Sequence, residues 1–521
     1  MTVDNTYLEV ARLKQEEREL LIRDEWRLED FEVKGTNVLH VPTSCGILTE
    51  REISITSDND AFDIVVKIRN DGYSCEEVTL AFCKRAAIAQ QLTNCLTEIF
   101  FEEAIERARE LDKQKAADPD NLPPLFGLPI SLKDSFNIPG KDSTIGLICF
   151  AHRPATEYSA LPSLLLSLGA VLYCKTNVPQ TMMTADSDNN VFGRTLNPNN
   201  LNLTAGGSTG GEGALIALRG SVAGFGTDIA GSIRIPSACN GIYGFRPSAD
   251  IVPYGGQQEP APEGVAGIAP VAGPMATSLR SVSFLLQSVM HAQPWRFDSS
   301  CLHMPWLSNA LPGNQRLKVG LVSDDGLSGD AGVGVVDLKL PDVAEAIDTA
   351  LQMFGLDGSE FVQALIKSGK EPLVESVKKV DLAAIPAASM ETYFQLNAAR
   401  HRIQEVYRKL WIENGLDALI MPPAPHTAVP FDTWGPITYT TLWNLLDYPA
   451  VIIPTGKVQP SDAADSIDNA KYGEQDAAMY RLYTGPEEYK DAPLTLQLVG
   501  MRQEDEKLAR VAAVVDGVLN T

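Results

Sequence analysis

The hydrophobic pattern alternates between helix-like and strand-like segments along most of the chain. In residues 78–118 apolar side chains recur at three- and four-residue spacing, which predicts two successive helices. Residues 123–137, "PPLFGLPISLKDSFN", instead indicate a short buried strand followed by a turn. Residues 161–180 predict a helix closed by Gly169 and then a strand at 170–176.

The order of helix, glycine and strand recurs in residues 213–228, "GALIALRGSVAGFGTD". Two short apolar runs, 418–424 and 449–455, are typical of buried strands. Residues 456–479 are polar and predict a surface loop. This alternation favours an α/β fold in which helices sandwich a mixed, largely parallel sheet.

The N-terminal segment is distinguished by its charge. Apolar residues at helical spacing predict a helix (Leu8, Leu13, Leu20 and Leu21), but the many charged residues between them are not those of a signal peptide or membrane anchor. No later run approaches the roughly 18 apolar residues of a membrane-spanning helix. We expect a helical extension over residues 1–60, a single domain over 61–521, and a soluble, cytoplasmic protein.

The overall composition narrows the function classes. The chain has 521 residues, of which 44% are hydrophobic and 21% charged, as in a globular protein with a large core. Its formal net charge of −24 repels nucleic-acid phosphates and anionic membrane surfaces. We therefore expect no nucleic-acid partner and no membrane anchor.

Cysteine and histidine show no metal-binding or disulfide pattern. The eight cysteines are scattered, without a CxxC pair, which predicts buried free thiols. The six histidines include no HExxH motif or paired ligand spacing. We expect neither a metal nor another cofactor.

The candidate chemistry lies in the glycine-rich stretch 205–241, "AGGSTGGEGALIALRGSVAGFGTDIAGSIRIPSACNG", which holds Ser208 and Ser232 with no histidine between them. Serine is a weak nucleophile without a base. "GGSTG" around Ser208 matches the nucleophile elbow of α/β-hydrolases, but a turn-rich loop precedes it where that motif needs a strand. A phosphate-binding loop lacks its G-K-[ST] ending, and the S-x-x-K match at 376–379 is short enough to arise by chance.

Three separated pieces of sequence together resemble the amidase signature family. They are "GLPISLKDSFNIPG" with Lys133, "GGSTG" with Ser208, and "GTDIAGSIRIPS" with Ser232. The resemblance continues through "NVPQTM", "FGRTLNP", "YGFRPS" and "APLTLQLVGMRQEDEKLARVA", and so covers roughly residues 60–515. "EVTLAFCKRAAIAQQLTNC" is similar to the branch of fungal acetamidases and fatty-acid amide hydrolases.

The resemblance implies a catalytic triad in which lysine replaces histidine. A neutral Lys133 would take a proton from Ser208, which in turn would deprotonate the nucleophile Ser232. The family also holds the peptide bond before the relay serine in cis, here Gly207–Ser208. Lys133 must then be uncharged, which burial among its apolar neighbours favours.

The same resemblance assigns the residues around the nucleophile. Backbone N–H groups of four consecutive residues would form the oxyanion hole (Ile229, Ala230, Gly231 and Ser232). Asp228 and Arg234 would hold the loops in place, and Met182 would lie near the bound carbonyl as part of the pocket wall. The implied activity is hydrolysis of a carboxamide through an acyl-enzyme.

Three departures from the family pattern concern the surroundings of the site. Relatives usually have serine where this chain has Thr209, and often glycine where it has Ala230. Relatives also place a helix between two strands that are joined here by the short "DGLSGDAG". We expect a rearranged sheet edge over residues 324–334, because parallel neighbours normally need a longer crossover.

The substrate stays open at this level. Apolar and aromatic residues, among them Tyr254, Trp443 and Tyr448, predict a pocket for a neutral or hydrophobic acyl group. Esterase or acyl transferase activity with the same triad, an amidotransferase-type subunit, and a non-catalytic scaffold remain alternatives. Family members are often homodimers, although the sequence does not determine the oligomeric state.

Overall fold

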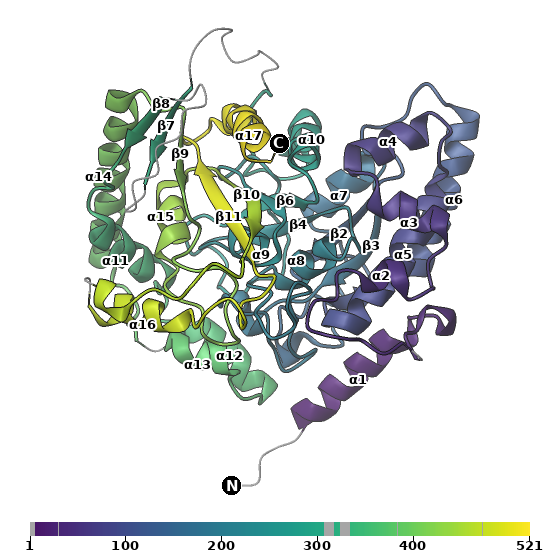
Figure 1. Cartoon of the computed structure of the whole chain (residues 1–521), viewed down its shortest axis with the longest axis horizontal. Coiled ribbons are helices and arrows are strands. Elements are labelled where there is room, and N and C mark those ends of the chain that lie inside the picture. Colours follow the sequence, from purple (N-terminus) through teal and green to yellow (C-terminus); the bar gives the residue numbers. More distant parts are fainter. Residues whose placement is uncertain are drawn as a thin grey trace.

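A single mixed sheet runs through the molecule (Figure 1). The computed structural model describes residues 6–29, 31–306, 317–322, 334–382, 384–470 and 473–520. Within them, eleven strands follow the order β1-β3-β2-β4-β6-β5-β10-β11-β9-β7-β8. Their bounds are β1 Leu96–Ile99, β2 Pro129–Lys133, β3 Val171–Thr176, β4 Ala223–Asp228, β5 Tyr243–Arg246, β6 Val271–Ala276, β7 Lys318–Leu321, β8 Gly334–Asp337, β9 Ala418–Met421, β10 Ala450–Lys457 and β11 Pro493–Val499.

Helices flank this sheet. Figure 1 shows α10 and α17 on one side of the central strands and α8 and α9 on the other. The α-helices of the described residues are α1 Thr6–Leu20, α2 Val41–Ser44, α3 Glu50–Ser57, α4 Ala61–Arg69, α5 Cys75–Thr93, α6 Phe101–Ala117, α7 Ala160–Ser167, α8 Gly210–Ala217, α9 Arg234–Asn240, α10 Leu279–His291, α11 Val343–Phe354, α12 Glu360–Gly369, α13 Glu375–Val380, α14 Met390–Asn414, α15 Thr438–Leu446, α16 Glu474–Leu482 and α17 Asp505–Leu519. Short 3-10 helices lie at Asp24–Trp26, Ile148–Phe150, Gln180–Met182, Pro294–Arg296 and Ile467–Asn469.

The expected α/β sandwich around a mixed sheet is confirmed, but the sheet is not largely parallel. Among the described strands, six pairings are antiparallel and four are parallel. The direction of a strand depends on the path of the chain between strands. The hydrophobicity of a short segment indicates whether a strand is buried. It does not indicate the direction of the strand, because buried parallel and antiparallel strands can have the same apolar composition.

Strands β7 and β8, at one edge of the sheet, flank the segment that was expected to be rearranged, residues 324–334. β7 pairs in parallel with both β8 and β9. Residues 323–333 lie outside the described residues, so the prediction for 324–334 stays a prediction.

Several local predictions are confirmed and others are corrected. The helix before β3 ends at Ser167 and is followed, as predicted, by Gly169, whose φ of +86° suits the left-handed conformation that glycine adopts readily. The helix before β4, α8, ends at Ala217. The left-handed residue that follows it is Arg219, with a φ of +55°, and not the predicted glycine. The two helices predicted over 78–118 are separated by the unpredicted strand β1, and α16 begins inside the predicted loop 456–479.

The core joins the N-terminal segment to the sheet. Ile22, Trp26 and Val41 belong to the same hydrophobic cluster as the strand residues Leu132 and Phe225. A second cluster lies beneath α11, α14 and α15 and contains Trp443 and Tyr448.

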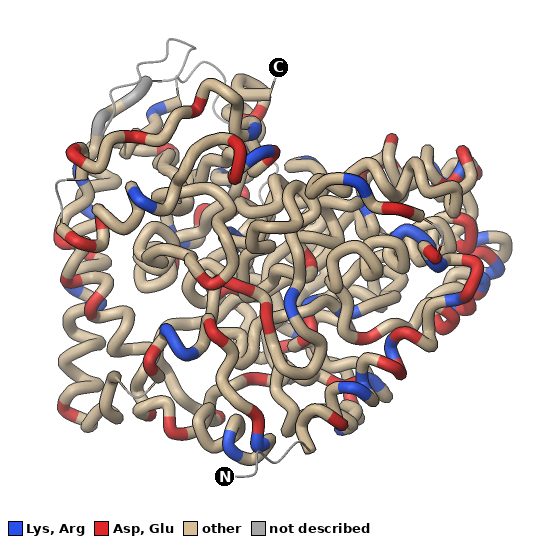
Figure 2. The backbone as a smooth tube through the Cα atoms, turned by 60° about the horizontal axis from the view of Figure 1, so that its bottom comes forward, with Lys and Arg blue, Asp and Glu red and all other residues tan. Residues whose placement is uncertain are grey.

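Charges are distributed over the outer elements. Figure 2 shows Lys and Arg positions interspersed with Asp and Glu, without one basic stripe. In the described part of the chain, no helix combines the length and the apolar character needed to cross a bilayer. All eight cysteines are free thiols there, as predicted; six of them are buried, whereas Cys45 and Cys149 are only partly buried.

Candidate active site

Lys133 and Ser208 meet beneath the sheet surface. Lys133 is the last residue of β2, and Ser208 lies two residues before α8. Lys133 Nζ is 2.7 Å from Ser208 Oγ and 2.7 Å from Thr227 Oγ1 of β4. The Gly207–Ser208 peptide bond is cis, the geometry that the family resemblance implies.

The surroundings of Lys133 favour its neutral form. Its side chain is fully buried, and burial lowers its pKa to about 7, against the opposing charges of Asp228 and Asp134. Among the described residues, no carboxylate lies within ion-pair distance of Nζ. Its two polar contacts are hydroxyl groups, which do not compensate a positive charge as a carboxylate would.

Helix α8 reaches the sheet because β4 carries glycines beneath it. A Cβ at Gly226 would lie 2.6 Å from Thr209 Cγ2, and one at Gly224 would collide with the carboxyl group of Glu212. That buried carboxyl group accepts hydrogen bonds from Ser131 of β2 and Thr176 of β3. The alternating glycines therefore seat the helix that follows Ser208 directly against the strands.

Ser232 lies on the loop that follows β4. This loop wraps around the Asp228 carboxylate, which accepts hydrogen bonds from the N–H groups of Gly231 (2.8 Å) and Ile233 (3.1 Å). Gly231 has a φ of +132°, and a Cβ there would lie 2.9 Å from Thr440 Cβ. Glycine is therefore the residue that fits this turn.

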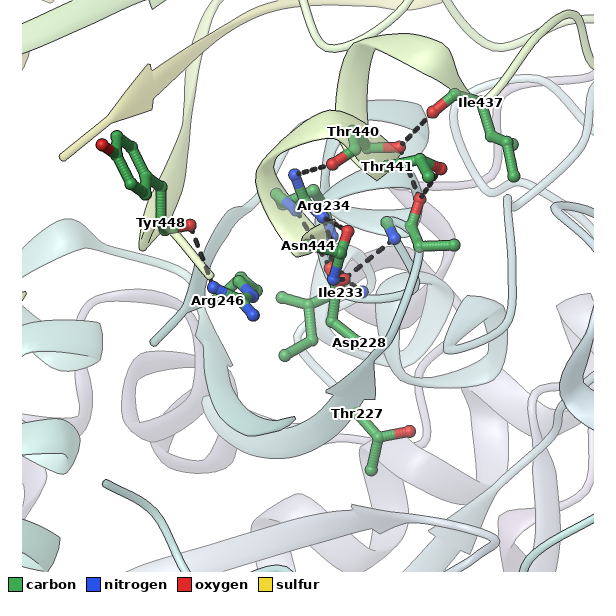
Figure 3. A network of polar contacts seen from close by, with 12 residues as sticks. Thr227, Asp228, Ile233, Arg234, Arg246, Ile437, Thr440, Thr441, Asn444 and Tyr448 are labelled. Carbon is green, nitrogen blue, oxygen red and sulfur yellow. Dashed lines mark hydrogen bonds and ion pairs between the residues drawn. The ribbon is translucent and has the colours of Figure 1, made fainter. Parts of the chain in front are cut away.

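Arg234 ties the loop to the rest of the molecule (Figure 3). Its guanidinium donates to both Asp228 oxygens, at 2.9 and 3.0 Å, and both side chains are fully buried. Burial opposes ionisation, yet the Arg234 charge holds the pKa of Asp228 well below its usual range. The guanidinium also donates to Thr440 O, Gln497 Oε1 and Asn444 Oδ1.

The two serine segments pack against each other. Asn240 Nδ2 of α9 donates to Ala205 O at 2.8 Å, and a Cβ at Gly206 would lie 2.9 Å from Pro236 Cα. Ser208 is only 2% exposed, whereas Ser232 is partly exposed. Ser232 is therefore the more accessible of the two hydroxyl groups.

The sequence matches the model of a known family. The family model described as Amidase covers residues 77–509. The chain belongs to the amidase signature family. It is a hydrolase that acts on amide bonds.

Individual relatives cover nearly the whole chain. An amidase of Gibberella moniliformis is 36% identical over 97% of this chain and 97% of its own length. An acetamidase of Aspergillus oryzae is 36% identical over 98% of both. A solved structure of fatty acid amide hydrolase superposes with a TM-score of 0.90 at 30% identity, covering 98% of this chain and 94% of that one.

The four N–H groups predicted for the amidase oxyanion hole differ in their contacts. The N–H of Gly231 donates to Asp228. Within the described residues, the N–H groups of Ile229, Ala230 and Ser232 have no hydrogen-bond acceptor. No protein acceptor among the described residues competes for these three donors.

Of the predicted pocket residues, Met182 lies in a short 3-10 helix, and Trp443 and Tyr448 lie in the core. Met182 is partly buried, within the 3-10 helix Gln180–Met182. Trp443 has no exposed surface and packs with Tyr448 at a ring distance of 6.2 Å. These two rings therefore belong to the core and not to an open pocket wall, which corrects the expectation.

Sequence motifs did not identify the residues that support the site. Thr227 contacts Lys133, and Asn444 contacts Asp228. Glu212 lies in α8, the helix that follows Ser208, and contacts Ser131. None of the three was predicted to have a role in the site. The glycines at 224 and 226 were the available signal, because alternate glycines in a strand mark a close approach. No group of His, Cys, Asp or Glu side chains in the described part of the chain is arranged to hold a metal.

Proposed function

We propose that this amidase cleaves a carboxamide through an acyl-enzyme on Ser232, with Ser208 as the proton relay and Lys133 as the base. The observation that carries the proposal is the buried contact between Lys133 Nζ and Ser208 Oγ, 2.7 Å long and without a compensating carboxylate. A lysine in that setting can act as a base near neutral pH.

During nucleophilic attack a proton would move toward Lys133, and in the next step it would move back toward the substrate. The Ser208 hydroxyl gives its proton to neutral Lys133 and takes the proton of Ser232, whose oxygen bonds to the amide carbon. Thr227 Oγ1 accepts an N–H of the amine. That contact leaves the lysine lone pair to face Ser208.

The developing oxyanion would be held by the loop after β4. The free N–H groups of Ile229, Ala230 and Ser232 are preorganised donors, and Gly231 fixes the shape of the loop through Asp228. When the carbon–nitrogen bond breaks, the proton returns through Ser208 to the leaving amine. Water then attacks the ester by the same relay and releases the carboxylic acid and Ser232.

We infer a neutral small-molecule amide as substrate, because the net charge of −24 disfavours anionic ones. The names of the relatives, acetamidase and fatty acid amide hydrolase, span short and long acyl groups. Ester hydrolysis or acyl transfer would use the same residues. An amidotransferase-type subunit would instead release ammonia to a partner.

The proposal is tested by product release from a panel of acetamide, benzamide and oleamide. We expect ammonia and the matching acid from at least one amide, and a loss of about 10⁴-fold or more in Ser232→Ala. Arg12→Ala, on the exposed face of α1, is the control. Amide turnover that survives in Ser232→Ala contradicts the proposal, and turnover of p-nitrophenyl acetate alone favours the esterase alternative.

A further inference from the structure

The loop that carries Met182 has an unusual backbone. Thr181 and Met182 have φ values of +71° and +60°, so two consecutive residues that are not glycine are left-handed. The Thr181 hydroxyl is buried and has no hydrogen-bond partner among the described residues. Such a backbone persists only where neighbouring structure holds it.

The same loop lies against the relay serine. The atoms that a Cβ at Gly207 would meet are Thr184 O, Ala185 C and Asp186 N, all in this loop. Gly207 is joined to Ser208 by the cis bond. Residues 184–186 of this loop therefore pack directly against the segment that carries Ser208.

Glu371 holds this loop from outside. It lies between α12 and α13, and its buried carboxylate accepts three hydrogen bonds: from the backbone N–H of Ile148 (2.7 Å), from Gln180 Nε2 (2.7 Å) and from Asn190 Nδ2 (3.0 Å). Gln180 and Asn190 lie on either side of the strained pair. In return, Gln180 Oε1 accepts the N–H of Val374 at 3.0 Å.

The two helices make further contacts with the loop. Ser376 Oγ of α13 lies 3.2 Å from Thr184 Oγ1. Val362 and Ile366 of α12 share a hydrophobic cluster with Met182. The S-x-x-K match at 376–379 thus has a structural explanation, because its serine contacts Thr184 and Lys379 Nζ donates to Asp432 O at 2.6 Å.

We propose that Glu371 is a positioning residue for substrate binding: its carboxylate fixes residues 178–190, and with them the left-handed Thr181–Met182 wall of the site. This inference rests on the proposed function and on the position near the bound carbonyl that the family resemblance implies for Met182. A carboxylate suits the role because it only accepts hydrogen bonds, and all three of its partners are donors.

Glutamine is the most informative substitution for Glu371, because it keeps the size of the side chain and changes only its hydrogen-bonding groups. Glu371→Gln would turn an N–H₂ group toward at least one of the three donors and break that contact. Ser376→Ala removes only the hydroxyl contact and serves as a milder second variant. Glu375→Gln, an exposed residue of α13, is the matched control.

Two measurements test the inference on the full chain: hydrogen exchange of peptides within residues 178–190, and inactivation by a fluorophosphonate resolved into KI and kinact. In Glu371→Gln we expect exchange of the loop to accelerate and KI to rise, each by about tenfold, because a hydrogen bond to a charged group is lost. We expect kinact to stay within about twofold, since no member of the Lys133–Ser208 pair is touched. Ser376→Ala should change both quantities in the same direction by less.

Unchanged loop exchange and KI in a folded Glu371→Gln protein, or in Ser376→Ala if the former does not fold, would overturn the inference. A fall in kinact at constant KI would also overturn it, because Glu371 would then act on the chemical step. Hydrogen exchange separates this inference from the proposed function. If the natural protein is not labelled, the proposed function fails while the exchange rates still report whether Glu371 holds the loop.

Discussion

Three lysine side chains are buried in the described part of the chain, and they differ in what compensates their charge. Lys14 pairs with Glu98 and Asp142 at 2.7 and 2.9 Å. Lys175 donates to Asp142 O and Ser143 Oγ and lies 3.9 Å from Asp134. Lys133 contacts only hydroxyl groups, and this distinguishes a candidate base from a structural lysine.

The reactivity of Ser232 should therefore depend on pH through Lys133. Because the base is the neutral amine, kinact/KI for a fluorophosphonate should rise as pH increases through about 7 and then level off. Below that pH the ammonium has no lone pair to accept a proton. Measurement between pH 5.5 and 8.5 on the natural protein and Lys133→Ala tests this, and equal profiles for the two proteins would contradict it.

At the residue scale, the family resemblance paired Lys133 with Ser208 and placed Asp228 and Arg234 together at the loop that carries Ser232. The members of each pair are in contact in the structure. The sequence motifs did not identify the partners that complete the network. Asn444 comes from α15, far along the chain, and its contact with Asp228 at 2.9 Å depends on tertiary packing.

At the scale of elements, two side chains of β2 contact α8 and the segment just before it. Ser131 and Lys133 lie on one face of β2, and they contact Glu212 and Ser208 respectively. Burial raises the pKa of Glu212 to about 7, opposed by the hydrogen bonds from Ser131 and Thr176. The carboxyl group thus helps to set the position of the helix that follows the relay serine.

Glu212→Gln should reveal this buried acid as a pH-dependent difference in stability. A raised folded-state pKa means that the contribution of Glu212 is complete below its usual value of 4.5 and is lost as pH rises through about 7. Glutamine does not titrate. Unfolding by urea at pH 5 and pH 8 should show the natural protein losing about 2 kcal/mol relative to Glu212→Gln, and a pH-independent difference would contradict the assignment.

Predictions of whole elements failed where the local pattern is ambiguous. Leu96 and Ile99 of β1 are three residues apart and so continue the helical period, and four residues are too few to distinguish helix from strand by spacing. The direction of β5, β6, β10 and β11 likewise depends on connections between distant residues. Strands β2, β3 and β4, each bounded by turn residues, were located correctly.

For the whole molecule, α1 is attached to the body by a buried charge. Lys14 reaches Glu98 of β1 and Asp142, and Arg18 donates to Leu96 O at 2.8 Å. Although burial alone would lower it, the two carboxylates raise the pKa of Lys14. The segment expected to be an extension over 1–60 therefore contributes to the same core as the sheet.

Removing the Lys14 charge should destabilise the whole molecule. Lys14→Met leaves two buried carboxylates without their cation, and we expect a loss of about 3 kcal/mol in unfolding free energy. Arg12→Ala, whose ion pairs with Glu9 and Glu16 are exposed and screened by solvent, should cost much less. Urea denaturation of both variants compares them, and equal losses would show that the Lys14 contacts are not an anchor.

In the proposed mechanism Ser232 is the nucleophile and Lys133 activates it through Ser208. The most direct test of this mechanism is fluorophosphonate labelling of the natural protein, Ser232→Ala and Lys133→Ala, with the modified peptide located by mass spectrometry. We predict an adduct on Ser232 that is absent in the first variant and forms about 10² to 10⁴ times more slowly in the second. An adduct on Ser208 in the natural protein, or undiminished labelling of Lys133→Ala, would contradict the account.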